Sequence, residues 1–495
     1  MPRLTIDGNS VDAPPEATVL EAAALAGIDI PTLCHVPGLR PQTSCMLCVV
    51  EDKRTGKTFP SCSTRAEEGM VIETATEALH AARREVLQLL LSEHVGDCEA
   101  PCRRICPAAL EVPLMMRKVR AGDREGAARL AKTALILPET LGWVCNAPCE
   151  RGCHRGTYDE PLLIKEMHRQ LAHDILRSQG PPSEPAPSTG KRVAIVGGGV
   201  AGLAAAWALA LRGHACTLFE REERCGGSLC ELDEAELPRA VLDAEIESIL
   251  SLGVQLHTRC QVGRDIPVEE LLEAFDAVLL ACEDEDLEDA EGEDHVFTAL
   301  ELPMAVNAVA EGKSVGDDLD RFLRDQPSAS RRKPFDCRLV EVGEHEKAAF
   351  AAHRMEPETQ GQGRQHGDIE AEAKRCLHCD CLKLESCKLR RYASEYGAKQ
   401  FAYRDVQRPQ IEAPLIAGSV QFELGKCIRC GLCVEITAVR GEPYGMAFVQ
   451  RGFETRVQPA LGHSLEEALT KTAQECIDAC PTAAFAWRDR EERES

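Results

Sequence analysis

The chain has 495 residues, a formal net charge of −24, 44% hydrophobic residues and only 4% aromatic residues. This charge argues against nucleic-acid and anionic-membrane partners, and no run approaches the roughly 18 consecutive apolar residues of a membrane span. The length suits about three or four domains. The 25 cysteines follow an N-terminus without an apolar leader. They therefore predict a cytoplasmic protein with metal or redox chemistry rather than disulfides.

Residues 1–80 predict a small β-grasp domain. A strand over Arg3–Ile6, a turn at Asp7-Gly8 and a helix over Thr18–Ala26 lead into a cysteine loop. A two-iron cluster needs four thiolates, two for each iron, and a structural zinc site is the alternative. The candidate ligands are Cys34, Cys45, Cys48 and Cys62.

The spacing of these four cysteines resembles the ferredoxin-type module at the N-terminus of the large iron–sulfur subunit of respiratory complex I. The diaphorase subunits of NAD-linked hydrogenases share this module. The resemblance implies a [2Fe–2S] cluster with a potential near about −400 mV. Such a cluster could exchange electrons with NADH, hydrogen or formate.

Residues 81–178 predict a helical domain, because residues 75–91 and 115–134 carry apolar side chains at helical spacing. Its cysteine motifs and the helix Pro161–His168 resemble the N-terminal domain of the glutamate synthase small subunit and of dihydropyrimidine dehydrogenase. The resemblance implies two interleaved [4Fe–4S] clusters. One would use Cys98, Cys102 and Cys153, and the other Cys106, Cys145 and Cys149.

Each of these two clusters lacks a fourth cysteine. His94 stands where the family has a first cysteine, and His168 stands where it has Gln or Glu. Imidazole can replace thiolate, and the exchange raises a cluster's potential because the ligand is neutral. Both histidines are therefore candidate ligands, and a surface or capping role is the alternative for each.

After a Pro/Gly/Ser-rich linker at 179–190, residues 191–325 predict a truncated Rossmann domain. A strand over Val193–Val196, a helix ending at Leu211 and a strand over Ala215–Glu220 form its opening βαβ unit. Glycines allow a pyrophosphate to approach the helix N-terminus, and an acidic residue can hold the ribose. The candidate residues are Gly197, Gly199, Gly202, Glu220, Gly226 and Gly227.

This segment resembles the FAD domain of the glutamate synthase small subunit, which implies bound FAD. The family's NADPH domain is missing, and only the acidic run Glu283–Glu293 stands in its place. Two glycine turns near the flavin are also replaced, by Ala281-Cys282-Glu283 and Ala299-Leu300-Glu301. The alternative is a scaffold that has lost the flavin.

A second linker is predicted at 326–370, a cysteine-rich segment at 371–410 and a [4Fe–4S] ferredoxin-like domain at 411–495. The cysteine-rich segment predicts an iron–sulfur or a zinc site, with His378 as a further possible ligand or a bystander. Its cysteines are Cys376, Cys379, Cys381 and Cys387. The last domain resembles the four-iron module of the complex I large subunit, and its ligands are Cys427, Cys430, Cys433 and Cys480.

Seven cysteines remain, and we interpret them as small buried residues or free thiols. They are Cys216, Cys225, Cys230, Cys260, Cys282, Cys337 and Cys476.

The predicted fold class is a multidomain α+β and α/β chain with one [2Fe–2S] cluster, about four [4Fe–4S] clusters and FAD. The predicted function is an electron-transfer subunit of a soluble oxidoreductase. Its partners would be an NADH-linked flavoprotein and a hydrogenase or formate dehydrogenase catalytic subunit. Flavin-based electron bifurcation is a further hypothesis. The alternatives are a flavin-less conducting scaffold and a stand-alone glutamate synthase-like reductase, and the missing NADPH domain argues against the reductase.

Overall fold

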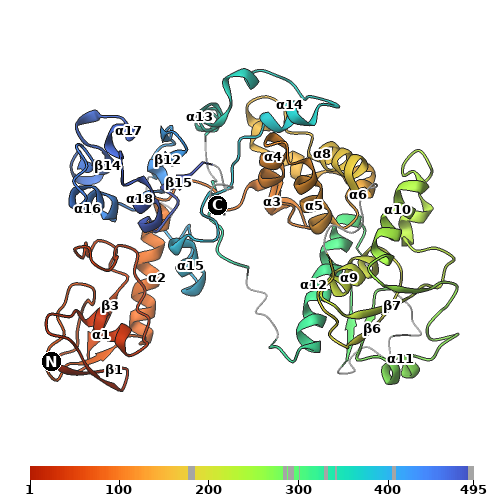
Figure 1. Cartoon of the computed structure of the whole chain (residues 1–495), viewed down its shortest axis with the longest axis horizontal. Helices are drawn as coiled ribbons and strands as arrows, with labels where there is room; N and C mark the ends of the chain where they lie inside the picture. Colours follow the sequence, from red (N-terminus) through yellow and green to blue (C-terminus); the bar gives the residue numbers. More distant parts are fainter. Residues whose placement is uncertain are drawn as a thin grey trace. The chain divides into compact units, whose positions relative to one another are not determined.

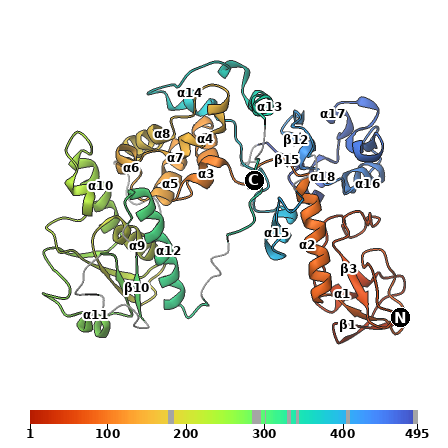
Figure 2. The same cartoon turned by 180° about the vertical axis from the view of Figure 1, so that it is seen from behind.

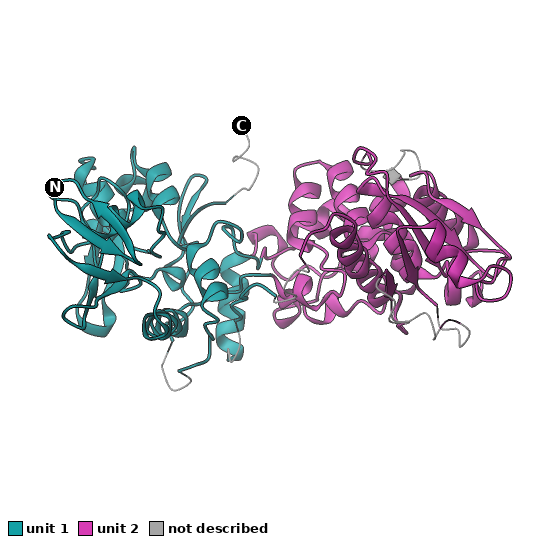
Figure 3. Ribbon diagram, turned by 90° about the horizontal axis from the view of Figure 1, so that it is seen from below, with its two compact units in different colours: residues 1–99, 333–354, 379–495 teal, residues 100–332, 355–378 magenta. Residues whose placement is uncertain are grey.

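The computed structural model describes residues 1–176, 184–282, 287, 295–299, 302–327, 333–339, 343–403 and 408–488. The chain forms two compact units, coloured separately in Figure 3. Unit 1 comprises residues 1–99, 333–354 and 379–495, and unit 2 comprises residues 100–332 and 355–378. Within the described ranges, no helix combines the length and apolarity that a membrane span requires.

Unit 1 begins with the predicted β-grasp sheet. β1 and β2 form an antiparallel hairpin, and its turn places Asp7 and Gly8 at φ values of 48° and 82°. β1 also runs parallel to β5, and β3 pairs antiparallel with both β4 and β5. Helix α1 (Val19–Leu25) starts at a capping box formed by Thr18 and Glu21. The strands are β1 (Arg3–Ile6), β2 (Asn9–Asp12), β3 (Val49–Asp52), β4 (Lys57–Pro60) and β5 (Val71–Glu73).

Helix α2 (Glu77–Ser92) follows this sheet and lies beside α15 (Lys388–Glu395), as Figures 1 and 2 show. The buried Arg83 joins α2 to the sheet, since its Nε donates to the Leu47 carbonyl at 3.1 Å. Its Nη2 donates to the Val49 carbonyl at 3.0 Å. These bonds tie the cysteine loop to a rigid helix.

The C-terminal part of unit 1 contains a three-stranded antiparallel sheet, a hairpin and short helices. The sheet has the order β11–β12–β15, and Phe422 of β12 stacks on Phe485 of β15. The strands are β11 (Leu415–Ala417), β12 (Val420–Phe422), β13 (Met446–Val449), β14 (Arg456–Pro459) and β15 (Phe485–Trp487). The helices are α16 (Leu432–Val439), α17 (Leu465–Ala468) and α18 (Ala473–Ala479).

Unit 2 opens with helices, as predicted, but the continuous apolar pattern over 115–134 is divided between α4 and α5. Gly122 adopts a φ of 80°, and Asp123 caps the second helix by accepting from the Gly126 amide at 2.7 Å. A left-handed glycine followed by a capping aspartate ends one helix and begins another. The helices are α3 (Pro101–Ile105), α4 (Val112–Arg120), α5 (Arg124–Leu135), α6 (Pro138–Val144), α7 (Pro148–Arg151) and α8 (Ile164–Leu171).

The Rossmann-type sheet of unit 2 is fully parallel, in the order β10–β9–β6–β7–β8. Helices α9 and α12 lie side by side against it (Figures 1 and 2). Gly312 makes this contact possible, since a Cβ there would lie 2.1 Å from the Ala201 carbonyl oxygen. The strands are β6 (Arg192–Val196), β7 (Ala215–Phe219), β8 (Gln255–His257), β9 (Ala277–Leu280) and β10 (Val296–Thr298). The helices are α9 (Val200–Leu211), α10 (Arg239–Leu250), α11 (Val268–Ala274) and α12 (Ala305–Leu323).

The range 326–370, predicted as a linker, contains helix α13 (Glu344–Arg354) and the start of α14 (Ile369–Lys374). Phe350 and Ala351 are the buried residues of α13. Two apolar residues are too few for the sequence pattern to predict a helix in this polar stretch. Most of the acidic run Glu283–Glu293 lies outside the described residues, as do Leu300, Glu301 and residues 177–183.

Candidate metal centres and dinucleotide site

The four N-terminal candidate ligands come together beneath the β-grasp sheet. Their side chains are at most 4% exposed. The Cys45 amide donates to the Cys34 sulfur at 3.4 Å. The thiols form two pairs, Cys34 with Cys45 and Cys48 with Cys62. Two pairs of sulfurs suit two irons that each require two thiolates.

Hydrogen bonding inside these pairs favours thiolates. The bond from Cys45 lowers the pKa of Cys34 to about 5, and the bond from Cys62 lowers the pKa of Cys48 to about 6. Thiolates are the form that binds metal, and these hydrogen bonds favour the thiolate of one sulfur in each pair.

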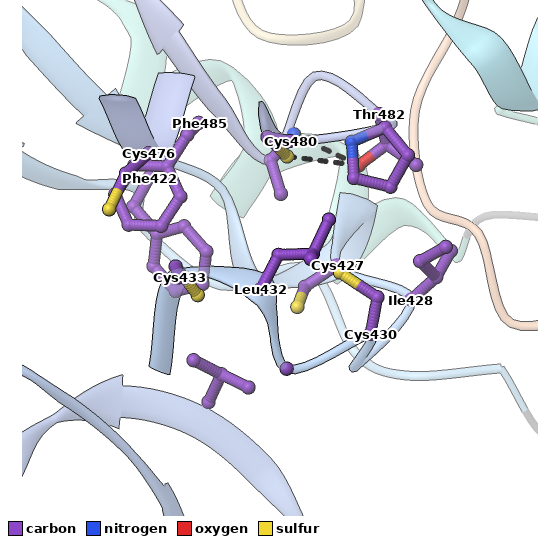
Figure 4. A pocket seen from close by; sticks show the side chains of 14 residues that line it. Phe422, Cys427, Ile428, Cys430, Leu432, Cys433, Cys476, Cys480, Thr482 and Phe485 are labelled. Carbon is purple, nitrogen blue, oxygen red and sulfur yellow. Dashed lines mark hydrogen bonds between the residues drawn. The ribbon is translucent and has the colours of Figure 1, made fainter. Parts of the chain in front are cut away.

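The C-terminal candidate ligands line one pocket with about 330 Å³ of empty space (Figure 4). Cys427, Cys430 and Cys433 come from one loop that turns into α16 at Gly431, where φ is 83°. Cys480 arrives from the end of α18. Burial raises the pKa of Cys427 to about 12. A buried thiol of this kind stays protonated until a metal displaces the proton.

The N-terminal and C-terminal sites are neighbours within unit 1. The Ser44 hydroxyl donates to the Cys430 carbonyl at 3.1 Å, which joins the two ligand loops. Cys45 and Cys430 share one apolar cluster, and the charge of Cys34 acts on the thiol of Cys430. The sequence contained no sign of this contact, because the two loops are almost 400 residues apart.

In unit 2, Cys106, Cys145 and Cys149 lie close to one another. Burial raises the pKa of Cys149, and the charges of Cys106 and Cys145 raise it further. Cys145 stands at the end of α6, and Cys149 lies within α7.

His168 is buried on α8, and its Nδ1 lies 2.8 Å from the Pro138 carbonyl. A carbonyl can only accept, so Nδ1 carries the proton and Nε2 keeps its lone pair. Burial lowers the pKa of His168 to about 4, which keeps the imidazole neutral at pH 7. This chemistry suits a ligand whose second nitrogen is oriented by the backbone.

Cys98 belongs to unit 1, whereas Cys102 and Cys153 belong to unit 2. Within unit 1, Cys98 lies with Cys381 and Cys387. The Cys381 amide donates to the Cys98 carbonyl at 2.9 Å. Burial raises the pKa of Cys98 to about 12, with added contributions from Cys381 and Cys387. This grouping differs from the sets expected from the sequence.

The predicted compact set Cys376–Cys387 is divided between the units, with Cys376 in unit 2 and the other three cysteines in unit 1. Arg375, next to Cys376, is fully buried. Burial raises the pKa of Cys153, and the nearby charge of Arg375 offsets part of that rise. In the same unit, Nε2 of His378 lies 3.1 Å from Arg120.

The glycine turn of the Rossmann domain has the geometry of a dinucleotide site. Gly202 admits no side chain, since a Cβ would lie 2.0 Å from the Gly197 carbonyl oxygen. Gly199 is the N-cap of α9 and faces open space, so the helix N-terminus is accessible to a pyrophosphate. Glu220, just after β7, accepts the Gly198 amide at 2.7 Å. Gly226 and Gly227 adopt φ values of 127° and 54°.

The glycine turn borders a cleft with about 2840 Å³ of empty space, open to solvent. Its walls include Gly197, Gly199, Glu220, Gly227 and also Cys145. The residues fit a dinucleotide such as FAD, and one wall carries a candidate cluster ligand.

Among the residues that the structure describes, no three His, Cys, Asp or Glu side chains converge as they would on a single metal ion. Seven cysteines were expected to be small buried residues or free thiols. Of these, Cys337 and Cys476 lie beside candidate sites, and Cys476 lines the C-terminal pocket.

Three family models match the chain. One, for a 2Fe-2S iron-sulfur cluster binding domain, covers residues 2–77. The second, for dihydropyrimidine dehydrogenase domain II with a 4Fe-4S cluster, covers residues 72–180. The third, for an NAD(P)-binding Rossmann-like domain, covers residues 195–244. The predicted multidomain fold class is confirmed: the chain contains domains of a [2Fe–2S] type, a [4Fe–4S] type and a Rossmann-like type.

The predicted resemblances are also confirmed. The chain is 36% identical over 205 residues to the NADP(+)-dependent formate dehydrogenase subunit beta of Moorella thermoacetica, covering 37% of this chain and 29% of that protein. It is 36% identical over 189 residues to the glutamate synthase [NADPH] small chain of Mycobacterium tuberculosis, covering 37% and 38% of the two chains. The chain thus spans about a third of the length of these relatives. A solved NAD+-reducing [NiFe]-hydrogenase is 33% identical over 24% of this chain and 49% of its own, with a TM-score of 0.18.

Proposed function

We propose that the chain is an iron–sulfur electron-transfer subunit of a multisubunit oxidoreductase. It would pass electrons between an NADH-linked flavoprotein and a hydrogenase or formate dehydrogenase-type catalytic subunit. The contact of separate cysteine groups within unit 1 carries this proposal. The N-terminal site touches the C-terminal site through Ser44 and Cys430. Cys387 lies 3.8 Å from the Pro481 carbonyl beside Cys480.

Electron transfer slows steeply with distance, so centres held by touching loops can exchange electrons rapidly. Lys383 strengthens the second contact, because its ammonium donates to the Ile477 carbonyl at 2.7 Å and to the Cys480 carbonyl at 2.9 Å. These carbonyls end α18, where a cation is favourable.

FAD is the dinucleotide that we propose for the cleft of unit 2. When bound, FAD would supply exchange between two-electron and one-electron chemistry. The pyrophosphate would be held by the amides at the start of α9, and the ribose by Glu220. Cys145 lines the same cleft, so the flavin would lie beside the site formed by Cys106, Cys145 and Cys149. Splitting of electron pairs between two acceptors is the finer hypothesis.

The test is to purify the full chain anaerobically and to measure iron, acid-labile sulfide and extractable flavin. We expect one [2Fe–2S] and about four [4Fe–4S] clusters, with spin coupling between the N-terminal and C-terminal centres after dithionite reduction. Zinc with little iron, or an EPR-silent reduced sample, would refute the proposal. Clusters without flavin would leave the conducting scaffold as the function and would exclude bifurcation.

A further inference from the structure

Three distant segments of unit 1 meet around Cys98. The Cys98 amide donates to the Cys337 carbonyl at 3.0 Å, and the Cys381 amide donates to the Cys98 carbonyl at 2.9 Å. Cys387 begins α15, where its sulfur accepts the Arg390 amide at 3.5 Å. The thiols of Cys381 and Cys387 both act electrostatically on Cys98, so the three sulfurs are close to one another.

Backbone amides donate hydrogen bonds to two of these sulfurs, those of Cys98 and Cys387. The Cys337 amide donates to the Cys98 sulfur at 3.3 Å. Amides directed at cluster sulfurs stabilise their negative charge and tune the potential. Arg390 holds the same segments together, because it donates to the Leu384 carbonyl at 3.2 Å and to the Glu99 carboxylate at 2.8 Å.

His94, four residues before Cys98, supplies an unsatisfied nitrogen. Its Nδ1 is buried and has no hydrogen-bond partner among the described residues. The segment that carries it is fixed by the bond from the Val95 amide to the Gly425 carbonyl, at 2.8 Å. Lys426 lies against Gly96 and acts electrostatically on both His94 and Cys381. A buried nitrogen without a partner is costly unless a ligand satisfies it.

We propose that Cys98, Cys381, Cys387 and His94 hold one [4Fe–4S] cluster within unit 1. This proposal rests on the proposed electron-transfer function and deepens it. This ligand set takes cysteines from two of the ligand groups that were predicted from the sequence. Cys98 leaves the set with Cys102 and Cys153, and Cys381 and Cys387 leave the compact set that began at Cys376.

The proposed cluster would bring three centres of unit 1 into contact, although their ligands are far apart in the sequence. The C-terminal site touches the N-terminal site at Cys430 and the Cys98 site at Pro481. Cys34, Cys45, Cys387 and Cys430 also share one apolar cluster, so the last cluster of the chain would be a close neighbour of both other centres of unit 1.

The test uses the full chain, prepared anaerobically, with single and double substitutions. Cys98→Ser and Cys387→Ser should each lose about four iron atoms and the same EPR signal. The double variant should lose no more iron than either single variant, because both residues hold one cluster. A loss of about eight iron atoms in the double variant would assign the residues to different clusters and overturn the proposal.

Cys337→Ala is the matched control, because the Cys337 thiol is buried beside Cys98 but is not one of the four proposed ligands. It should keep its iron, and loss of the cluster there would replace His94 by Cys337 in the ligand set and overturn the proposal. His94→Cys should keep the iron and shift the midpoint of this one cluster to a more negative potential, since an anion replaces a neutral ligand. An unchanged midpoint would remove His94 from the set.

The signals of the N-terminal and C-terminal clusters serve as internal reporters of folding, because they belong to the same unit. If wild-type protein carries no iron, the proposed function itself fails. If iron is present but Cys98→Ser removes the same signal as Cys102→Ser while Cys387→Ser removes another, only the ligand assignment fails.

Discussion

Glu442 is expected to anchor the helix that delivers Cys480. Its carboxylate accepts the amides of Lys471 and Thr472, each at 2.9 Å, and the Thr472 hydroxyl at 2.7 Å. It also accepts the Thr470 amide at 3.2 Å. These groups precede α18, so the carboxylate ties the start of that helix to the end of α16.

The size of this effect follows from the pKa of Glu442. Burial would raise the pKa, but the hydrogen bonds from Thr470, Lys471 and Thr472 outweigh it and lower the pKa from 4.5 to about 2. That difference corresponds to about 3 kcal/mol, or about 2 kcal/mol after allowance for partial exposure. The stabilisation is complete above pH 4.5 and is lost as the pH falls through about 2.

Glu442→Gln removes the charge but keeps the shape of the side chain. We expect the amides of α18 to exchange hydrogen about 30-fold faster at pH 7, equivalent to about 2 kcal/mol. Hydrogen exchange measured by mass spectrometry on the full chain would show this, together with faster loss of iron to a chelator.

Glu475→Gln is the matched control on the same helix. Glu475 forms an exposed ion pair with Arg440 at 2.8 Å, which is worth less than about 1 kcal/mol. Its exchange should change by only a few-fold. If the Glu442 and Glu475 variants behave alike, the carboxylate does not anchor α18 and the reasoning is refuted.

Three further changes test other parts of the chain. Thr18→Ala removes the capping box of α1 and should cost about 1 kcal/mol, seen as earlier thermal bleaching of the N-terminal cluster; an unchanged midpoint would contradict it. Gly199→Ala places a methyl group in open space, so the protein should fold but retain less flavin. Gly202→Ala should also disrupt folding, because a Cβ there meets the Gly197 carbonyl. Equal flavin in wild type and Gly199→Ala would argue against the pyrophosphate site. Glu245→Gln removes a buried carboxylate that accepts the Thr140 amide at 2.7 Å and faces Lys132. We expect the free energy of unfolding to fall by about 3 kcal/mol, measured by thermal unfolding. No decrease would show that the Glu245–Lys132 pair is not needed for stability.

Local patterns in the sequence were sufficient for the elements and for the short ligand loops. The strand Arg3–Ile6 has the same bounds in the structure, and the βαβ unit from Val193 is confirmed within a residue or two. The loop Cys427–Cys433 could be identified because three ligands within seven residues can meet whatever surrounds them. Each of these features depends on contacts between neighbours along the chain.

Only the tertiary structure decided which distant cysteines meet. Cys98 is almost 300 residues from Cys381 and Cys387, and nothing in the spacing distinguishes this partnership from one with Cys102. The same holds for the contact between Ser44 and Cys430. A cysteine motif predicts how many ligands a loop provides. The packing of α2, α15 and α18 determines which loops share a metal centre. That packing depends on side-chain fit rather than on any repeat in the sequence.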